Sequence, residues 1–207
     1  MRITHTRRFA KSLPGKMLAL AGSVVLVCGL LGLSLVFLSS RASNVALASG
    51  NALHPFTITS PNFHDGGPLS TKQEINQFGC TGSNIAPELN WTNVPTGTES
   101  FALLMSDYDA PVDGGFHHWI VYNIPGNARE LEGNHAFTEG MNSYGFIGYG
   151  GPCPPPTGET HHYLFLLYAT NTANIGGPGF TFGEVIKALS GHVLGATSII
   201  GTFHLPL

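Results

Sequence analysis

Three short apolar runs, separated by stretches rich in glycine, proline and aspartate, constrain the fold of this chain more than any other feature. They span residues 101–106, 118–124 and 162–170, and leucine, aromatic and β-branched residues predominate in them. Runs of this length and composition favour β-strands over helices. Turns are favoured elsewhere, because the sequence contains 27 glycines and 14 prolines. The chain is therefore predicted to be mainly β.

Weaker patterns add further elements. Residues 56–59 and 199–204 are expected to form an opening and a closing strand, and residues 70–74 could form one helical turn. Apolar residues recur at helical spacing across 180–189, and Gly191 stands where a helix would stop. The architecture predicted from these elements is an antiparallel β-sandwich, in which sheet packs on sheet, with one or two peripheral helices.

The charge of the chain is divided unevenly along its length. Residues 49–207 contain three Lys or Arg and all twelve Asp and Glu, so their net charge is −9 with histidine neutral. Nucleic acids and anionic membrane surfaces repel an acidic domain, which disfavours both as partners of the folded part. With 207 residues, of which 43% are apolar, the chain is expected to form one substantial core and one domain, residues 49–207.

Residues 1–48 have the features of a targeting segment. A basic stretch precedes 22 uncharged residues, 17–38, and Ala46 and Ala48 stand before Ser49 as in a signal-peptidase site. The apolar stretch is longer than the ~7–15 residues of a secretory core and matches the ~20 that span a bilayer as a hydrophobic helix. A cleaved signal peptide and an uncleaved membrane anchor both stay open. Either one places the domain outside the cytoplasm, secreted or periplasmic.

Polar side chains gather where the three apolar runs begin or end. Asp107 and Asp109 follow the first run two residues apart, so both would point to one face if the strand continued. The histidine pairs 117–118 and 161–162 lead into the second and third runs. Glycines at 150–151 would let backbone N–H groups converge on an anion. Such clusters at strand ends are typical of small-ligand sites.

Each of these patterns has another interpretation. The aspartates could be turn formers that accept hydrogen bonds from loop N–H groups, and each histidine pair could place one ring inside the protein and one outside. A metal site of the cupin type is disfavoured, because it uses His-x-His with a later Glu, whereas these histidines are directly adjacent. Hydrolase chemistry is also disfavoured, because Ser100 and Ser106 lack a nucleophile elbow and no Gly-x-Ser-x-Gly occurs. No metal and no cofactor are expected.

Several ordered motifs together resemble the phosphatidylethanolamine-binding protein family, in particular its bacterial Raf-kinase-inhibitor-like branch. The motifs are Asp-Tyr-Asp-Ala-Pro at 107–111, His-His-Trp at 117–119, Gly-Pro-Cys-Pro-Pro at 151–155 and His-His-Tyr at 161–163. The resemblance extends from about residue 56 to the C-terminus. It implies a β-sandwich with a small pocket for phosphate-type anions, in a protein that acts by binding and not as an enzyme. The site residues that it implies are Asp107, Asp109, Pro111, His118, Gly151, His161 and Tyr163.

Two residues depart from the family pattern. Tyr108 stands where the first motif usually has Pro, and His162 stands where the last has Arg. Without that Arg, the carboxylates have only histidines as cations beside them. Anion binding is therefore expected to strengthen from pH 8 to pH 6, as His117, His118, His161 and His162 acquire charge. Replacing His162 by Arg is expected to restore a permanent cation.

Cys80 and Cys153 are the two cysteines outside the apolar targeting segment. Export to an oxidising compartment favours a disulfide between them, and two free thiols packed as small apolar groups are the other interpretation.

Together these features predict an exported binding protein for a phosphate-containing small molecule or phospholipid head group. Membrane contact would run through residues 17–38 if these are retained. Two other functions stay open: a kinase or protease inhibitor that presents the pocket rim to a protein partner, and a hydrolase that uses the Asp/His cluster.

Overall fold

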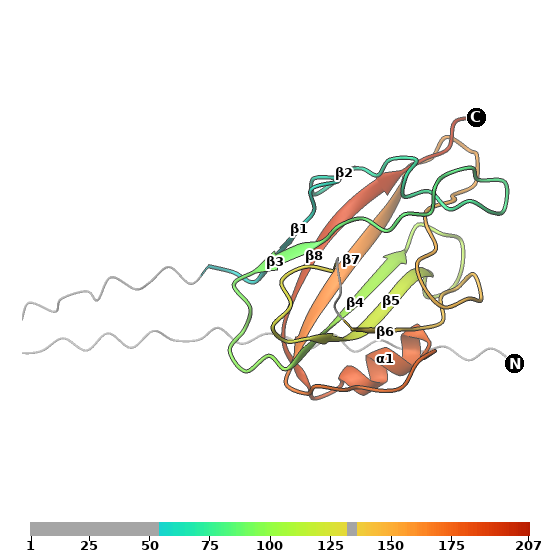
Figure 1. The fold of residues 1–207 in the computed structure, drawn as a ribbon. Helices are drawn as coiled ribbons and strands as arrows, with labels where there is room; N and C mark the ends of the chain where they lie inside the picture. The colour runs from blue at the N-terminus through green and yellow to red at the C-terminus, as the bar shows by residue number, and fades with distance from the viewer. Residues whose placement is uncertain (1–53, 132–135) are drawn as a thin grey trace, which may run out of the picture. The chain divides into compact units, whose positions relative to one another are not determined.

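The computed structural model describes residues 54–131 and 136–207 (Figure 1). The predicted targeting segment, residues 1–48, lies outside the described residues, together with its hydrophobic helix and its cleavage site. In the part of the chain that is described, no helix has the length and apolar character needed to cross a bilayer. The described residues form a mainly β structure with one α-helix, as predicted.

A six-stranded sheet forms the centre of the fold. Its strand order is β2-β8-β7-β4-β5-β6, and every pair is antiparallel except β2 with β8, which is parallel. The strands are β2 (Gly67–Pro68), β4 (Ser100–Asp107), β5 (Phe116–Pro125), β6 (Thr138–Glu139), β7 (His161–Thr170) and β8 (Val193–Phe203). The edge strands have two residues each, so the four long inner strands form the body of the sheet.

The three main predicted strands are confirmed as β4, β5 and β7, with slightly wider bounds. The closing strand, predicted from residue 199, begins at Val193. Residues 193–198 could not be predicted as a strand, because they are mostly exposed and lack a clear apolar alternation. Hydrogen bonding to β7, and not burial, holds them in the sheet. The helical turn expected at 70–74 is a turn that does not continue into a helix.

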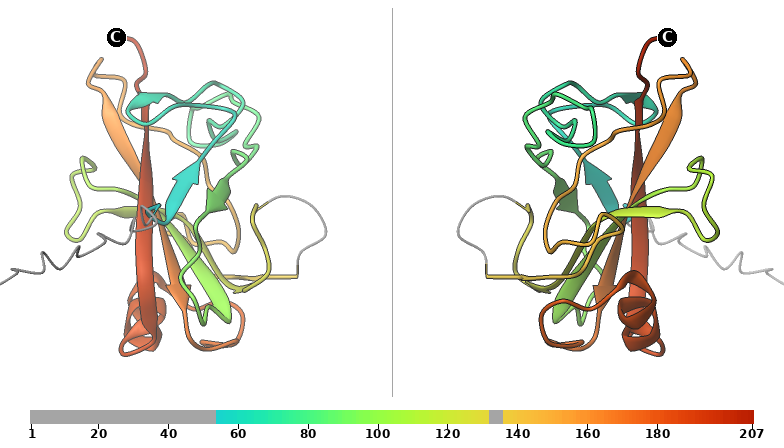
Figure 2. Two further views of the ribbon diagram at one scale, coloured as in Figure 1. Left: turned by 90° about the vertical axis from the view of Figure 1, so that its left-hand side faces the viewer. Right: turned by 90° about the vertical axis from the view of Figure 1, so that its right-hand side faces the viewer.

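A second and slighter layer covers one face of the sheet (Figure 2). It contains the antiparallel pair β1 (Thr57–Thr59) and β3 (Asn90–Thr92), which place Ile58 and Trp91 in the main core beside Phe101. Segments outside the strands supply the rest of this layer. Their buried residues include Phe63, Leu69, Leu89, Ala128, Leu131 and Tyr149. The predicted sandwich of two full sheets is not confirmed, because loops take the place of most of the second sheet.

Helix α1 (Phe182–Leu189) covers the opposite face and confirms the helix predicted at 180–189. It begins after Thr181, whose hydroxyl accepts a hydrogen bond from the Glu184 N–H, while the Glu184 carboxylate accepts one from the Thr181 N–H. This reciprocal capping satisfies donors that the first turn of a helix leaves unpaired. The core between α1 and the sheet contains Val185, Leu189, Ala102, Leu104, Ile120 and Tyr122.

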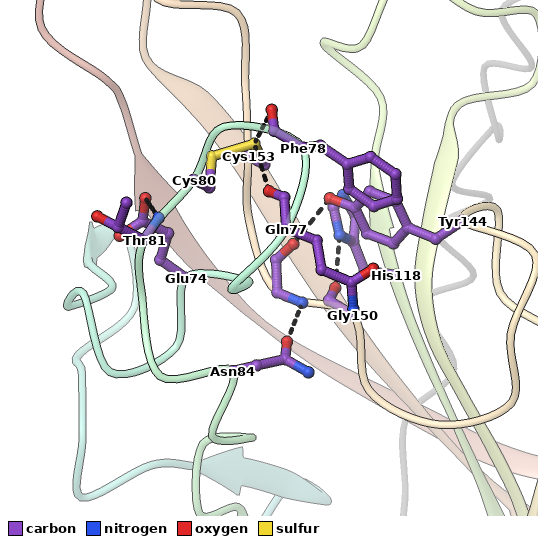
Figure 3. Close-up of a disulfide and its surroundings, with 11 residues drawn as sticks. Glu74, Gln77, Phe78, Cys80, Thr81, Asn84, His118, Tyr144, Gly150 and Cys153 are labelled. Carbon is purple, nitrogen blue, oxygen red and sulfur yellow. Dashed lines mark hydrogen bonds between the residues drawn. A yellow bond between two sulfur atoms is a disulfide. The ribbon is translucent and has the colours of Figure 1, made fainter.

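A disulfide joins Cys80 to Cys153, in agreement with one of the two interpretations of these cysteines (Figure 3). It links the segment before β3 to the segment before β7, which lie 73 residues apart in sequence. Beside it, the Gly151 N–H donates a hydrogen bond to Asn84 Oδ1 at 2.9 Å. A side chain at Gly151 would collide with the Gln73 carbonyl oxygen, so glycine is required for this close approach.

Removing the disulfide is expected to lower the free energy of unfolding by about 4 kcal/mol, because a cross-link over this span restricts the unfolded chain. Urea denaturation of the oxidised protein, of the reduced protein and of a Cys80→Ser/Cys153→Ser variant measures this loss. Alkylation and mass spectrometry establish the thiol state of each sample. Equal denaturation midpoints in the oxidised and reduced samples would contradict the expectation.

Candidate functional site

Three strand ends meet at one end of the large sheet. Strand β4 ends at Asp107, which lies opposite Phe116 at the start of β5 and opposite Tyr163 near the start of β7. The register of the sheet thus brings together the polar residues that the sequence places at the ends of its apolar runs. Four buried residues there are called the strand-end cluster: Asp107, His118, His161 and Tyr163.

A β-bulge in β5 turns His118 toward this cluster. Met105 pairs with Trp119 and Ser106 pairs with His117, so His118 is an extra residue in the ladder. Simple alternation would place His118 with Ile120, on the face that α1 covers. Instead its ring lies edge-on to that of Tyr163, with the ring centroids 5.1 Å apart.

Asp107 is the most highly bonded member of the cluster. Its Oδ2 accepts a hydrogen bond from His161 Nδ1 at 2.7 Å, and its Oδ1 accepts bonds from the N–H groups of Asp109 and Ala110 at 2.9 and 3.1 Å. The residue is 3% exposed. A buried carboxylate requires such partners, because burial without them is strongly unfavourable. The bonds therefore tie the end of β4 both to β7 and to its own loop.

His118 is held as a neutral imidazole. Its Nδ1 donates to the Gly150 carbonyl oxygen at 2.8 Å, because a carbonyl can only accept. Burial lowers the pKa of His118 to about 4, and the Gly150 hydrogen bond and the Asp107 charge oppose this shift only in part. At neutral pH the Nε2 atom is therefore a hydrogen-bond acceptor. The expectation that His118 gains charge between pH 8 and pH 6 is wrong.

Tyr163 carries a hydroxyl group with no hydrogen-bond partner among the described residues. The side chain is fully buried. Burial, and then the negative charge of Asp107, raise the pKa of Tyr163, so the hydroxyl keeps its proton. Buried hydroxyls are nearly always hydrogen-bonded, so this group marks a place where a ligand or water can be recognised.

The glycines of the loop before β7 play a different part from the one predicted. The Gly150 N–H donates to the His118 carbonyl oxygen at 3.0 Å, and the Gly151 N–H donates to Asn84. Both donors are thus engaged within the protein and do not converge on an anion site. Gly151 instead allows close packing of two loops, and Gly150 accepts the bond that orients His118.

Asp109 and His162 lie outside the cluster and pair with each other. The Asp109 carboxylate accepts hydrogen bonds from His162 Nδ1 at 2.8 Å and from its backbone N–H at 2.7 Å. The His162 hydrogen bond lowers the pKa of Asp109. The His162 side chain is 58% exposed and the Asp109 side chain is 46% exposed. The expectation that Asp107 and Asp109 share one face is wrong, because the strand ends at Asp107 and the chain turns there.

Two other predicted residues also lie apart from the cluster. Pro111 is exposed in the loop between β4 and β5. His117 faces the α1 side, where its ring stacks on Phe182 at a centroid distance of 3.6 Å and its Nδ1 bonds Ser106 Oγ at 2.9 Å. Partial burial lowers the pKa of His117. His117 therefore lies on the other face of the sheet and His162 is paired with Asp109, so neither ring belongs to the strand-end cluster.

Sequence reasoning missed the aromatic residues around the cluster. The Tyr144 ring lies edge-on to His118 at a centroid distance of 5.5 Å, and its hydroxyl donates to the Gly151 carbonyl oxygen at 2.9 Å. The Phe116 ring lies 5.0 Å from that of His118. Neither residue belongs to a recognisable motif, and only the arrangement of loops in space brings Tyr144 to the site.

Two hollows in the described surface lie away from this cluster. One, of about 750 Å³, is bounded by residues 57–65 together with Ser198 and Ile199. The other, of about 600 Å³, is lined by residues that include Lys72 and Phe137. Neither is lined by a member of the strand-end cluster, which is enclosed by its aromatic neighbours. In residues 54–131 and 136–207, no three His, Cys, Asp or Glu side chains are grouped so that they could hold a metal ion.

The lowered pKa of His118 predicts acid destabilisation. The unfolded chain protonates this histidine near pH 6.5 and the folded chain only near about 4, so stability present above pH 6.5 is lost as the pH falls through this window. The full loss is on the order of 3 kcal/mol. The free energy of unfolding, measured by denaturation at pH 7 and at pH 4.5, should fall less in His118→Gln than in the parent protein. The Gln side chain keeps a donor for the Gly150 carbonyl oxygen. An equal loss in parent and variant would refute the assignment.

Comparisons with known proteins show the family to which this chain belongs. The sequence model of the phosphatidylethanolamine-binding protein family matches residues 59–204. The UPF0098 protein of Aquifex aeolicus is 39% identical over 134 residues, 61% of this chain and 78% of that protein. A Mycobacterium tuberculosis H37Rv relative named "Putative lipoprotein LppC" is 40% identical over 158 residues, 73% of this chain and 74% of that protein.

A solved structure is similar over the same part of the chain. The crystal structure of Escherichia coli YbcL, described as a new member of the mammalian PEBP family, has a TM-score of 0.69 and 31% identity. The alignment covers 73% of this chain and 99% of that one. From the family match, the sequence identities and the shared fold, the chain belongs to the phosphatidylethanolamine-binding protein family and to its bacterial branch.

Proposed function

We propose that the strand-end cluster binds a phosphate-type anion and that the protein acts by binding rather than by catalysis. The observation that carries the proposal is the Tyr163 hydroxyl, a buried donor with no partner among the described residues. It lies in one buried group with His118, His161 and Asp107. Phosphate oxygens are strong acceptors, and a hydroxyl donor held in a buried site is suited to them.

The protonation states of the histidines select the form of the anion. His161 donates from Nδ1 to Asp107, so its Nε2 can donate to a ligand only when the ring is doubly protonated. His118 presents Nε2 as an acceptor at neutral pH. A phosphate monoanion, which retains one P–OH group, can donate to His118 and accept from Tyr163. The dianion cannot donate and is also repelled by Asp107, so the monoanion is the proposed ligand form.

A hydrolase has less support. Asp107 and His161 form a pair of the kind that activates a nucleophile, but Ser106 lies on the opposite face, bonded to His117. Export of the domain is proposed as well, supported by the signal-like features of residues 1–48 and by the lipoprotein name of the mycobacterial relative.

Calorimetric titration with ethyl phosphate tests the proposed function. Affinity should rise about fiftyfold from pH 8 to pH 6, because the monoanion is about 1% of a phosphate monoester with a second pKa of ~6 at pH 8 and about 50% at pH 6. Tyr163→Phe should weaken binding at pH 6 by about tenfold or more, through loss of a hydrogen bond to a charged ligand. Absence of binding by the parent protein at both pH values, or stronger binding at pH 8, would refute the proposal.

His162→Arg is the matched control for the same titration. Because His162 is exposed and paired with Asp109, a permanent cation there should leave the affinity at pH 8 unchanged within about a factor of two. The sequence alone predicts instead that Arg at this position restores a permanent cation to the site. A large gain in affinity at pH 8 would show that the charge at this position acts on the site.

A further inference from the structure

Two aromatic side chains lie between the strand-end cluster and solvent (Figure 3). Phe78 is 65% exposed, Tyr144 beneath it is partly buried, and His118 beneath Tyr144 is 3% exposed. The Phe78 and Tyr144 rings stack almost in parallel, with centroids 5.1 Å apart and an interplanar angle of 6°. The order from solvent inward is therefore Phe78, Tyr144 and His118.

The Tyr144 side chain is held over the cluster by one hydrogen bond and by contacts between aromatic rings. Its hydroxyl makes one hydrogen bond, to the Gly151 carbonyl oxygen. Its ring contacts four others, those of Phe78, Phe116, His118 and Phe146. Burial and the negative charge of Asp107 raise the pKa of Tyr144, in keeping with a ring that lies close to the buried carboxylate. These contacts are all non-covalent and individually weak, so the side chain can leave its place in a minor open state without unfolding of the sheet.

The position of Phe78 is restrained by its backbone and by the nearby disulfide, and not by burial of its side chain. Its backbone φ of 60° lies in the left-handed region, which a bulky residue rarely adopts. Cys80, two residues later, is joined by the disulfide to Cys153, in the same loop as Gly151. A large apolar side chain that is both exposed and strained has no stabilising role in the core. Its position is explained by the contact that it makes with Tyr144.

We propose that Tyr144 is the gate of the anion site and that Phe78, anchored by the Cys80–Cys153 disulfide, holds this gate closed. The inference rests on the proposed function, since it assumes that an anion enters the strand-end cluster. The cluster members are between 0% and 5% exposed, so no phosphate can reach them until a covering side chain moves. Opening breaks the bond to Gly151 and the stack on Phe78, and a ligand whose site is rarely open binds with reduced apparent affinity.

The gate is tested without any ligand by diethyl pyrocarbonate labelling, which modifies neutral and accessible imidazoles. Mass spectrometry follows the modification of His118 and His161, with exposed His64 as the internal reference. Phe78→Ala should accelerate labelling of the two buried histidines at least fivefold relative to His64. Phe137→Ala removes a partly exposed phenyl ring elsewhere on the surface and should change nothing. Equal labelling rates in the parent and Phe78→Ala would overturn the gate.

Variants of Tyr144 distinguish between two roles of this residue, a gate over the site and a direct contact with the ligand. Tyr144→Phe keeps the stack but loses the bond to Gly151, so its labelling rate should lie between those of the parent and Tyr144→Ala. Titration with ethyl phosphate should give equal or tighter binding in Tyr144→Ala and Phe78→Ala. Weaker binding in Tyr144→Ala would overturn the proposal by assigning Tyr144 to the ligand. Faster labelling without ethyl phosphate binding in any variant would leave the gate standing and refute the proposed function.

Discussion

The hydrogen bonds of Asp107 are the constraint on which the site depends. One carboxylate oxygen accepts from His161 on β7, and the other accepts from the two N–H groups that start the loop toward β5. A carboxylate at this depth is tolerable only with such partners. Through them a single residue sets the direction of an imidazole and the course of a loop. The geometry of the cluster is therefore a consequence of satisfying one buried charge.

Burial also determines what the other cluster members can do. Around His118, three aromatic rings exclude water, which keeps the imidazole neutral and turns it into an acceptor. The site has no permanent cation among its described members, and the domain around it is acidic. Recognition of an anion in such surroundings must rely on hydrogen-bond pattern rather than on net charge. The proposed anion site is therefore expected to discriminate between protonation states of one ligand.

Much of the fold and part of the site could be predicted from the sequence. Strands β4, β5 and β7 were predictable because each is an apolar run, and the family motifs identified Asp107, His118, His161 and Tyr163. The bulge at His118 could not be predicted, because it depends on pairing with β4 and not on local composition.

Two further contacts could not be predicted from the sequence for a related reason. They are the pairing of Asp109 with His162 and the contact of Tyr144 with His118. Each contact joins segments that only the complete sheet brings together. Local periodicity carries information about which face a residue occupies, and it carries none about loops that cross between faces.

The pairing of β4 with β7 has a consequence for how the chain folds. Asp107 and His161 are 54 residues apart in sequence, whereas β4 and β5 are neighbours joined by one loop. Closing the shorter loop costs less chain entropy, so the hairpin can form early and the contact with β7 must come later. The strand-end cluster thus exists only in chains in which β4 has paired with β7. A ligand held there would stabilise only chains that have made the β4–β7 contact, and it would leave the isolated hairpin of β4 and β5 unaffected.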